Sequence, residues 1–320
     1  MAWRGREMRR ISALLLLSLV SAALLASCLD AGKAVRNVGA SAGTASDAVE
    51  TSRKSLSGGV PESTVGVSHI DGDLAEAAGV SSHVAFAEKT ADSGGSGYDA
   101  DTVLAVRYGV HRDYERTVID LGTGEAPAGT VPDWTLTSPE GDGLMRVDLP
   151  SANATCVSGG KFGEGLLGSF HVVRAPDDGM FVDFLARKPF RYRVLGLEDP
   201  ARLILDFKPA AEDQNVAPPA QGGDTVLIEP RPNSVISDPL TVNGYSRNPG
   251  AANTITLIGP RGKILVRRTV GSNDWSHTWG YFEATLDLPS FSGRGNLRVG
   301  TGSAPDGTFE GVEIPVRTGR

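Results

Sequence analysis

The sequence predicts a mainly β protein with two folded domains. Short stretches of alternating or continuous apolar residues, rich in β-branched side chains, recur along most of the chain. Clusters of Gly, Pro, Asp and Asn separate them, and the 320 residues include 40 glycines and 19 prolines. This composition is typical of many turns between short strands. A predicted linker at residues 210–224 divides the strand-forming part into two segments of domain size.

The first 28 residues have the pattern of a secretory signal. Four arginines precede an apolar run over residues 11–25, and small residues then lead to Cys28. This run is shorter than the roughly 20 residues that a membrane-spanning helix needs. The ending Leu25-Ala26-Ser27-Cys28 resembles a bacterial lipobox, which implies removal of residues 1–27 and attachment of a diacylglyceryl lipid to Cys28. A transmembrane anchor and an ordinary signal peptide are the alternatives.

The lipid at Cys28 is expected to hold the chain on the extracytoplasmic face of the cell membrane, which is its predicted partner. Two acyl chains hold a protein stably where one does not. Residues 28–81 are rich in small and polar side chains, without strong periodicity, and predict a flexible tether between the lipid and the folded part.

The charge balance excludes nucleic acid as an expected partner. The chain carries a net charge of −7, and residues 1–27 contribute four arginines and one glutamate, so the remainder carries −10. Binding to phosphates needs clustered Lys and Arg, and no basic stripe with interleaved aromatic residues occurs in the sequence.

No motif in the sequence predicts catalysis, a metal or a cofactor. The five histidines are scattered, and zinc-site, nucleophile-elbow and phosphate-loop patterns are absent. With Cys28 assigned to lipid, Cys156 is left without a disulfide partner, and a buried thiol is a commoner role for it than catalysis. A hydrolase that uses Cys156 or scattered carboxylates is the remaining enzymatic alternative.

The first predicted domain spans residues 82–209 and contains an internal repeat. Its expected strands are residues 102–108, 116–121, 144–149, 168–174, 180–185 and 201–207. The pattern R-x5-D-x2-R-x3-D, followed by an apolar residue, begins at Arg107 and again 86 residues later at Arg193. We expect Arg116 and Arg202 to hold equivalent positions, each with an aspartate at the end of its strand, in two related halves.

Three parts of this domain carry a family resemblance: residues 103–122, 170–174 and 190–207. They resemble the AMIN-like domain of actinobacterial exported proteins. The resemblance implies a small symmetric β-domain that localises envelope proteins, apparently through peptidoglycan. Arg116 and Arg202 are therefore candidate binding residues, and a structural role for the Arg/Asp pairs is the alternative.

The second predicted domain spans residues 225–317. Its expected strands are residues 225–229, 240–246, 254–259, 263–270, 281–288, 296–301 and 311–316. Seven short strands at close spacing predict a β-sandwich. Residues 260–263 predict a hairpin turn, and Leu240, Val242 and Gly244 are expected to face inward.

This segment resembles the Gmad-type immunoglobulin-like domain associated with bacterial spore-germination proteins and related lipoproteins. The resemblance rests on residues 232–244, 262–265, 279–282, 297–299 and 303–307. It implies a sandwich used for envelope interactions. Within its aromatic stretch, Trp279 and Phe282 are expected in the core, while Trp275 and Tyr281 are candidate binding residues.

Together these features predict a lipid-anchored, non-enzymatic envelope protein that binds peptidoglycan or an envelope partner through two β-domains. A protein-interaction or assembly factor without affinity for glycans is the main alternative.

Overall fold

The computed structural model describes residues 63–64, 84–87, 90–138, 143–210, 218–301 and 309–318. The predicted signal peptide, Cys28 and all but two residues of the predicted tether lie outside this part. The described residues form strands and two short 3-10 helices, η1 (Pro249–Ala251) and η2 (Pro260–Gly262), without an α-helix. None of the helices described is long and apolar enough to cross a membrane. The prediction of a mainly β protein is confirmed.

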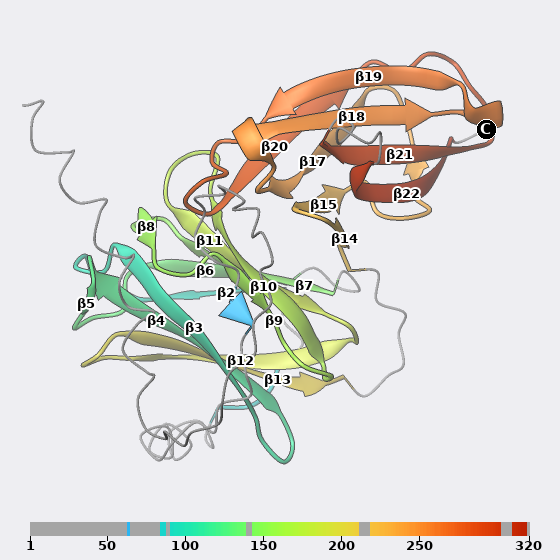
Figure 1. The fold of residues 1–320 in the computed structure, drawn as a ribbon. Coiled ribbons are helices and arrows are strands. Elements are labelled where there is room, and N and C mark those ends of the chain that lie inside the picture. Colours follow the sequence, from blue (N-terminus) through green and yellow to red (C-terminus); the bar gives the residue numbers. More distant parts are fainter. Residues whose placement is uncertain are drawn as a thin grey trace, which may run out of the picture. The chain divides into compact units, whose positions relative to one another are not determined.

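Two sheets form what we call the N-terminal module, residues 90–210. Its strands are β2 (Ala91–Gly94), β3 (Thr102–Val110), β4 (Glu115–Thr123), β5 (Ala126–Pro127), β6 (Trp134–Thr137), β7 (Leu144–Leu149), β8 (Ala154–Thr155), β9 (Gly159–Lys161), β10 (Leu167–Arg174), β11 (Met180–Ala186), β12 (Phe190–Leu197) and β13 (Arg202–Pro209). One sheet has the order β12-β13-β4-β3-β8, with β5 beside β4, and the other contains β10-β11-β7-β6-β2, with β9 beside β10 (Figure 1). Strand β1 (Ser63–Thr64), from the predicted tether, pairs with β9.

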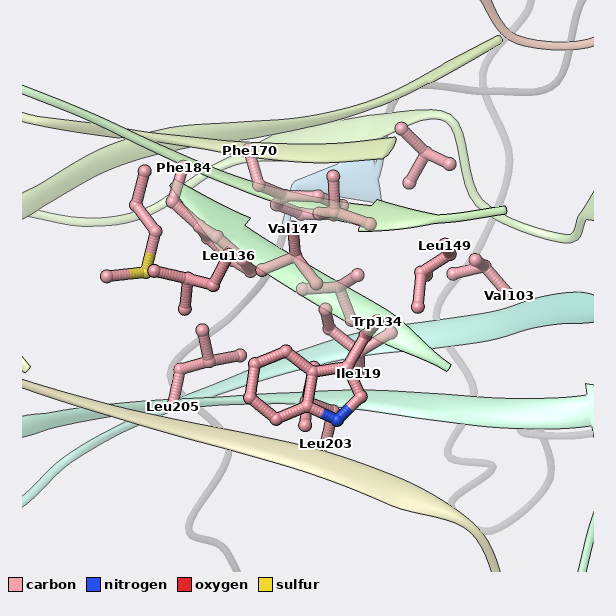
Figure 2. Packing of buried hydrophobic residues seen from close by; sticks show 14 of the residues in the cluster. Val103, Ile119, Trp134, Leu136, Val147, Leu149, Phe170, Phe184, Leu203 and Leu205 are labelled. Atoms are coloured by element: carbon pink, nitrogen blue, oxygen red, sulfur yellow. The ribbon is translucent and has the colours of Figure 1, made fainter. Parts of the chain in front are cut away.

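A hydrophobic core fills the space between these two sheets. In β6, buried and exposed residues alternate, so that Trp134 and Leu136 both point inward. Figure 2 shows Leu136 and Phe184 of one sheet directed toward Leu203 and Leu205 of the other. Each such fully buried side chain contributes about 1.5–3 kcal/mol to folding, which is how this module folds without a disulfide among its described residues.

The sequence repeat forms four consecutive strands of the first sheet. Strands β3 and β4 make one antiparallel hairpin, β12 and β13 make the other, and β4 pairs with β13 in the middle. In this central ladder Arg116 lies opposite Asp206, and Arg202 lies opposite Asp120. The two halves are thus related at the level of register, as the repeat predicts. The aspartates lie inside their strands rather than at the ends, because β4 and β13 each continue three residues further.

The C-terminal module, residues 218–318, is a two-sheet sandwich. Its strands are β14 (Ala220–Gly222), β15 (Thr225–Glu229), β16 (Val235–Ile236), β17 (Leu240–Ser246), β18 (Ala252–Ile258), β19 (Ile264–Gly271), β20 (Trp279–Leu286), β21 (Arg294–Thr301) and β22 (Glu310–Thr318). Strands β14-β15-β17-β20 form one layer and β16-β22-β21-β18-β19 the other. Buried residues of both layers form one core, including Val242, Phe282 and Leu297.

The seven strands expected here are all present, within two residues at each end. The predicted turn at 260–263 is η2 with its flanks, and Arg261 adopts a positive φ of 62° there. Leu240, Val242 and Gly244 are buried as expected. Strand β14 lies inside the predicted linker, where Ala220 opposite Leu227 adds it to the edge of the sandwich.

Candidate functional site

The two modules meet along strands β10 and β20, a region that we call the joint. The strands pair in parallel, Val173 opposite Trp279 and Arg174 opposite Gly280, and so connect one sheet of each module. A Cβ at Gly280 would lie 2.0 Å from the carbonyl oxygen of Asp274. Only glycine therefore allows the Asp274 segment, which precedes β20 in the chain, to lie this close to β20.

A separate hydrophobic cluster is buried at the joint. Its members are Leu144, Val173, Phe181, Leu185, Val226, Tyr245 and Trp279. They explain why all seven residues of β11 are buried: one face of the strand packs in the core of the N-terminal module and the other faces this cluster.

His171 is enclosed by the same cluster. Its ring lies 4.6 Å from that of Trp279, edge to face, and 5.3 Å from that of Tyr245. Its Nε2 lies 3.4 Å from Oε1 of Gln221 on β14. Burial lowers the pKa of His171 to about 4, although the contact with Gln221 opposes this shift. The imidazole is therefore neutral at physiological pH.

Polar contacts close the rim of the joint. The guanidinium of Arg174 donates to the carboxylate of Asp274 (3.1 Å). Asn273 donates its side-chain amide to the carbonyl oxygen of Ala175 (2.8 Å) and accepts from the backbone N–H of Tyr281 (2.8 Å). The segment between β19 and β20 is thus tied to the end of β10.

Asp274 also fixes the loop that carries Trp275. Its Oδ1 accepts hydrogen bonds from the backbone N–H groups of Trp275, Ser276 and His277 (2.6–3.1 Å). Burial by itself would raise the pKa of Asp274, but these bonds and the one from Arg174 hold it below its ordinary value. The indole of Trp275 is consequently held at the surface with 41% of the residue exposed.

A cleft of about 300 Å³ lies beside the joint. It is lined by the turn between β10 and β11, which contains Asp177 and Asp178, by Arg146 and Asp148 on β7, and by Tyr281 on β20. Both modules therefore contribute to one cleft, whose size is at the lower end of the range for small-molecule sites.

Arg146, in the lining of the cleft, forms an ion pair and stacks on an aromatic ring. Arg146 donates two hydrogen bonds of 2.8 Å to Asp183, directly opposite it on β11. Its guanidinium also lies 3.8 Å from the centre of the Phe181 ring. The charge of Arg146 is thus compensated by Asp183, which leaves the carboxylates of Asp148, Asp177 and Asp178 as the net charge of the lining.

Asp148 and Tyr281 give the cleft its hydrogen-bonding character. Burial raises the pKa of Asp148, while nearby Arg146 opposes that shift. The Tyr281 hydroxyl donates to Glu283 (2.6 Å), and burial together with this bond raises the tyrosine pKa. The site therefore combines an aromatic ring with several carboxylate acceptors, which suits a ligand that carries hydroxyl or ammonium groups.

The structure brings together two of the sequence-predicted candidates and separates the others from them. Tyr281 lines the cleft and Trp275 lies on the adjoining loop, both connected through Asn273 and Asp274. Trp279 and Phe282 are in the core, as expected, with 3% and 1% exposure.

Arg116 and Arg202 lie in the central ladder of the N-terminal module. Arg116 is completely buried against Asp206, so a ligand at the surface has no access to its guanidinium. Arg202 is half-buried and donates to the carbonyl oxygen of Pro200 (3.2 Å). Cys156 is half-buried, and Cys28, the candidate lipidation site, lies outside the described residues.

The cleft residues on β7 and β11 were not singled out from the sequence. The Asp177-Asp178-Gly179 segment is one of the Asp- and Gly-containing clusters that separate the expected strands, and Asp178 adopts a positive φ of 112° there. Alternation of Arg146 and Asp148 on a predicted strand indicated one polar face, but no sequence signal pairs that face with Tyr281, more than a hundred residues away. Within the described part of the chain, no group of three or more His, Cys, Asp or Glu side chains is arranged to hold a metal ion.

Comparison with known proteins supports the resemblance for one module. Neither curated proteins nor solved structures give a match to the chain. Residues 226–308, from β15 through β21 and the segment beyond it, match one family. The C-terminal module is accordingly similar to the immunoglobulin-like domain of bacterial spore germination (Gmad2), a non-catalytic type of β-module.

Proposed function

We propose that this chain is a non-enzymatic, lipid-anchored protein on the extracytoplasmic face of a cell membrane, and that it binds peptidoglycan in the cleft beside the joint. The lipobox resemblance at Cys28 supports the anchor. The AMIN-like resemblance of residues 82–209 and the Gmad2 match support an envelope-binding role for both modules.

The observation that carries the binding proposal is the composition of the cleft. Tyr281 offers a ring on which a sugar can stack, and Asp148, Asp177 and Asp178 offer acceptors for its hydroxyl groups. Peptidoglycan presents such hydroxyl groups on its sugars and free ammonium groups on its peptides. An acidic cleft favours these ligands over phosphate-bearing polymers, which the same carboxylates repel.

Retention on purified peptidoglycan tests this proposal. The Cys28→Ser chain, which carries no lipid, is expected to cosediment with the polymer. Tyr281→Ala and the double substitution Asp177→Asn with Asp178→Asn should each weaken retention about tenfold, while the melting temperature stays close to that of the parent. Asn tolerates the positive φ at position 178, so the turn is preserved.

Matched control substitutions separate the cleft from general charge effects. Glu125→Gln and Asp133→Asn remove exposed carboxylates elsewhere on the N-terminal module, and they should leave retention unchanged. If the parent chain stays in solution with intact peptidoglycan, the proposal of wall binding is wrong.

A second candidate function, protein assembly without glycan affinity, is favoured by Trp275. An indole that is 41% exposed on a loop fixed by Asp274 is a suitable anchor for a protein interface. Chemical crosslinking in membranes, compared between the parent chain and Trp275→Ala, distinguishes the two functions. Recovery of a protein partner that depends on Trp275, with no retention on peptidoglycan, would favour assembly; recovery of glycan fragments alone would count against it.

A further inference from the structure

The five-stranded sheet of the C-terminal module is basic, although the chain as a whole carries −7. Its strands and the η2 hairpin carry seven cations and two carboxylates, namely Arg261, Lys263, Arg267, Arg268, Arg294, Arg298, Arg317, Glu310 and Glu313. Of these, Arg298 is paired with Glu313 (2.9 Å). The remaining cations give this sheet a positive net charge, whereas the lining of the cleft is negative.

Four of the cations gather at one end of the sheet, which we call the basic end: Arg261, Lys263, Arg294 and Arg317. All four are exposed, and within the described residues none is paired with a carboxylate. Arg294 and Arg317 lie directly opposite each other on β21 and β22. Like charges at opposed positions destabilise a sheet, so an anion at this place would relieve their repulsion.

Exposed apolar side chains lie on the same surface. Val235 is opposite Arg317 and is 57% exposed. Ile264 is opposite Ile258 and is 49% exposed. Paired residues project from the same face of a sheet. Asn296 pairs with Ile258 and lies two residues after Arg294 on β21, so Ile264 and Arg294 project from the same face. The basic end therefore mixes cations with accessible aliphatic groups.

The basic end is at the far end of its strands from the joint. The turn at η2 connects β18 and β19 at the basic end, whereas the other end of β19 leads into the Asp274 loop. Two carboxylates of the other layer, Asp238 and Asp287, lie in loops at the same end of the sandwich. Asp238 accepts the backbone N–H of Leu288 and so is directed toward the loop that follows β20.

We propose that the basic end docks on an anionic lipid surface. Charge complementarity selects an anionic partner, and the exposed Val235 and Ile264 select a bilayer, because aliphatic side chains gain free energy in the interfacial region and gain little on a soluble polyanion. This docking is independent of the lipid at Cys28 and of the peptidoglycan cleft. It would hold the C-terminal module at the membrane while the cleft stays available.

Vesicle cosedimentation with the unlipidated Cys28→Ser chain tests the proposal. We expect binding to mixed phosphatidylcholine–phosphatidylglycerol vesicles, weak binding to pure phosphatidylcholine vesicles, and loss of binding as salt is raised. Each cation near such a surface contributes roughly fivefold to partitioning, so Arg294→Gln with Arg317→Gln should weaken binding roughly 25-fold. Ile264→Ser should weaken it further at every salt concentration.

The matched control is Arg112→Gln with Lys188→Gln, which removes two exposed cations from the N-terminal module. This pair should bind vesicles as the parent does. Equal binding by the basic-end and control variants, or equal binding to both kinds of vesicle, would overturn the proposal. Binding to soluble polyphosphate without binding to anionic vesicles would also overturn the proposal, and would indicate that the basic end binds a polyanion instead. None of these results depends on whether peptidoglycan enters the cleft.

Discussion

Arg116 and Asp206 lie directly opposite each other in the β4–β13 ladder, and their bidentate ion pair (2.6 and 2.9 Å) is completely buried. Arg193 donates to the same carboxylate (2.8 Å). The second repeat position, Arg202 opposite Asp120, has the same register without this pair, because Asp120 is bonded to Arg107 instead. The two copies of the repeat thus form two equivalent positions whose arginines differ in solvent exposure.

Replacement of these arginines should therefore have unequal costs. Arg116→Ala removes one of two cations from a buried carboxylate and leaves a cavity, so we expect a loss of about 3 kcal/mol in the free energy of unfolding. Arg202→Ala, at the half-exposed equivalent position, should cost about 0–1 kcal/mol. Urea unfolding followed by circular dichroism measures both. Similar costs for the two variants would contradict the assignment of Arg116 to a buried structural pair.

The burial of His171 predicts a loss of stability in mild acid. The pKa is about 4 in the folded chain and 6.5 for an ordinary histidine. Below pH 6.5, His171 binds a proton in the unfolded chain but stays neutral in the folded chain. The free energy of unfolding therefore falls between about pH 6.5 and 4, and below that range this group contributes no further change. The contribution amounts to about 3 kcal/mol. Unfolding free energies measured across this range should show the slope.

Two substitutions identify the histidine that is responsible. His171→Gln cannot titrate, so its stability should depend less on pH between 6.5 and 4 than that of the parent. His111→Gln is the control, because burial, with nearby Arg116, also lowers the pKa of His111. If the His111 variant loses the slope and the His171 variant keeps it, the role given to His171 is wrong.

Most of the longer strands were predictable because they carry their own local signal. Alternation over 240–246 and the apolar run over 180–185, which only Asp183 interrupts, are local patterns, and they place β17 and β11 correctly. Strand β12 was not predicted as a strand, although its sequence lies in the repeat. Its polar residues Arg191 and Arg193 interrupt the apolar pattern, and the charge of the buried Arg193 is compensated by Asp206.

The joint and the cleft were not predictable, because they depend on contacts between distant segments. Phe181 is an ordinary core residue in the sequence, yet it packs against Tyr245 of the other module (6.1 Å between ring centres). The pairing of β10 with β20 covers two positions and follows no sequence pattern. Trp275 could be identified as a surface candidate, but the carboxylate that fixes its loop, Asp274, carries no motif.

Membrane association should depend on Cys28 if the lipobox resemblance is correct. Cys28→Ser removes the thiol that accepts the lipid, so the variant should accumulate as an uncleaved precursor or appear in the soluble fraction. Fractionation after a high-salt wash measures this, since the wash removes protein held by the basic end alone. A normally processed, firmly membrane-bound Cys28→Ser chain would disprove lipid anchoring.

The shared core at the joint predicts that the two modules unfold together. Trp279 fills this core between β10 and β17, so calorimetry of the parent chain should show one cooperative transition for both modules. Trp279→Ala should cost about 3–5 kcal/mol and divide that transition into two, because it weakens the contact between modules more than either core. Trp134→Ala is the matched control: the same side chain is lost from the core of the N-terminal module, so the midpoint should fall while a single transition is retained. Two transitions in the parent chain, or division by both substitutions alike, would show that the joint does not couple the modules.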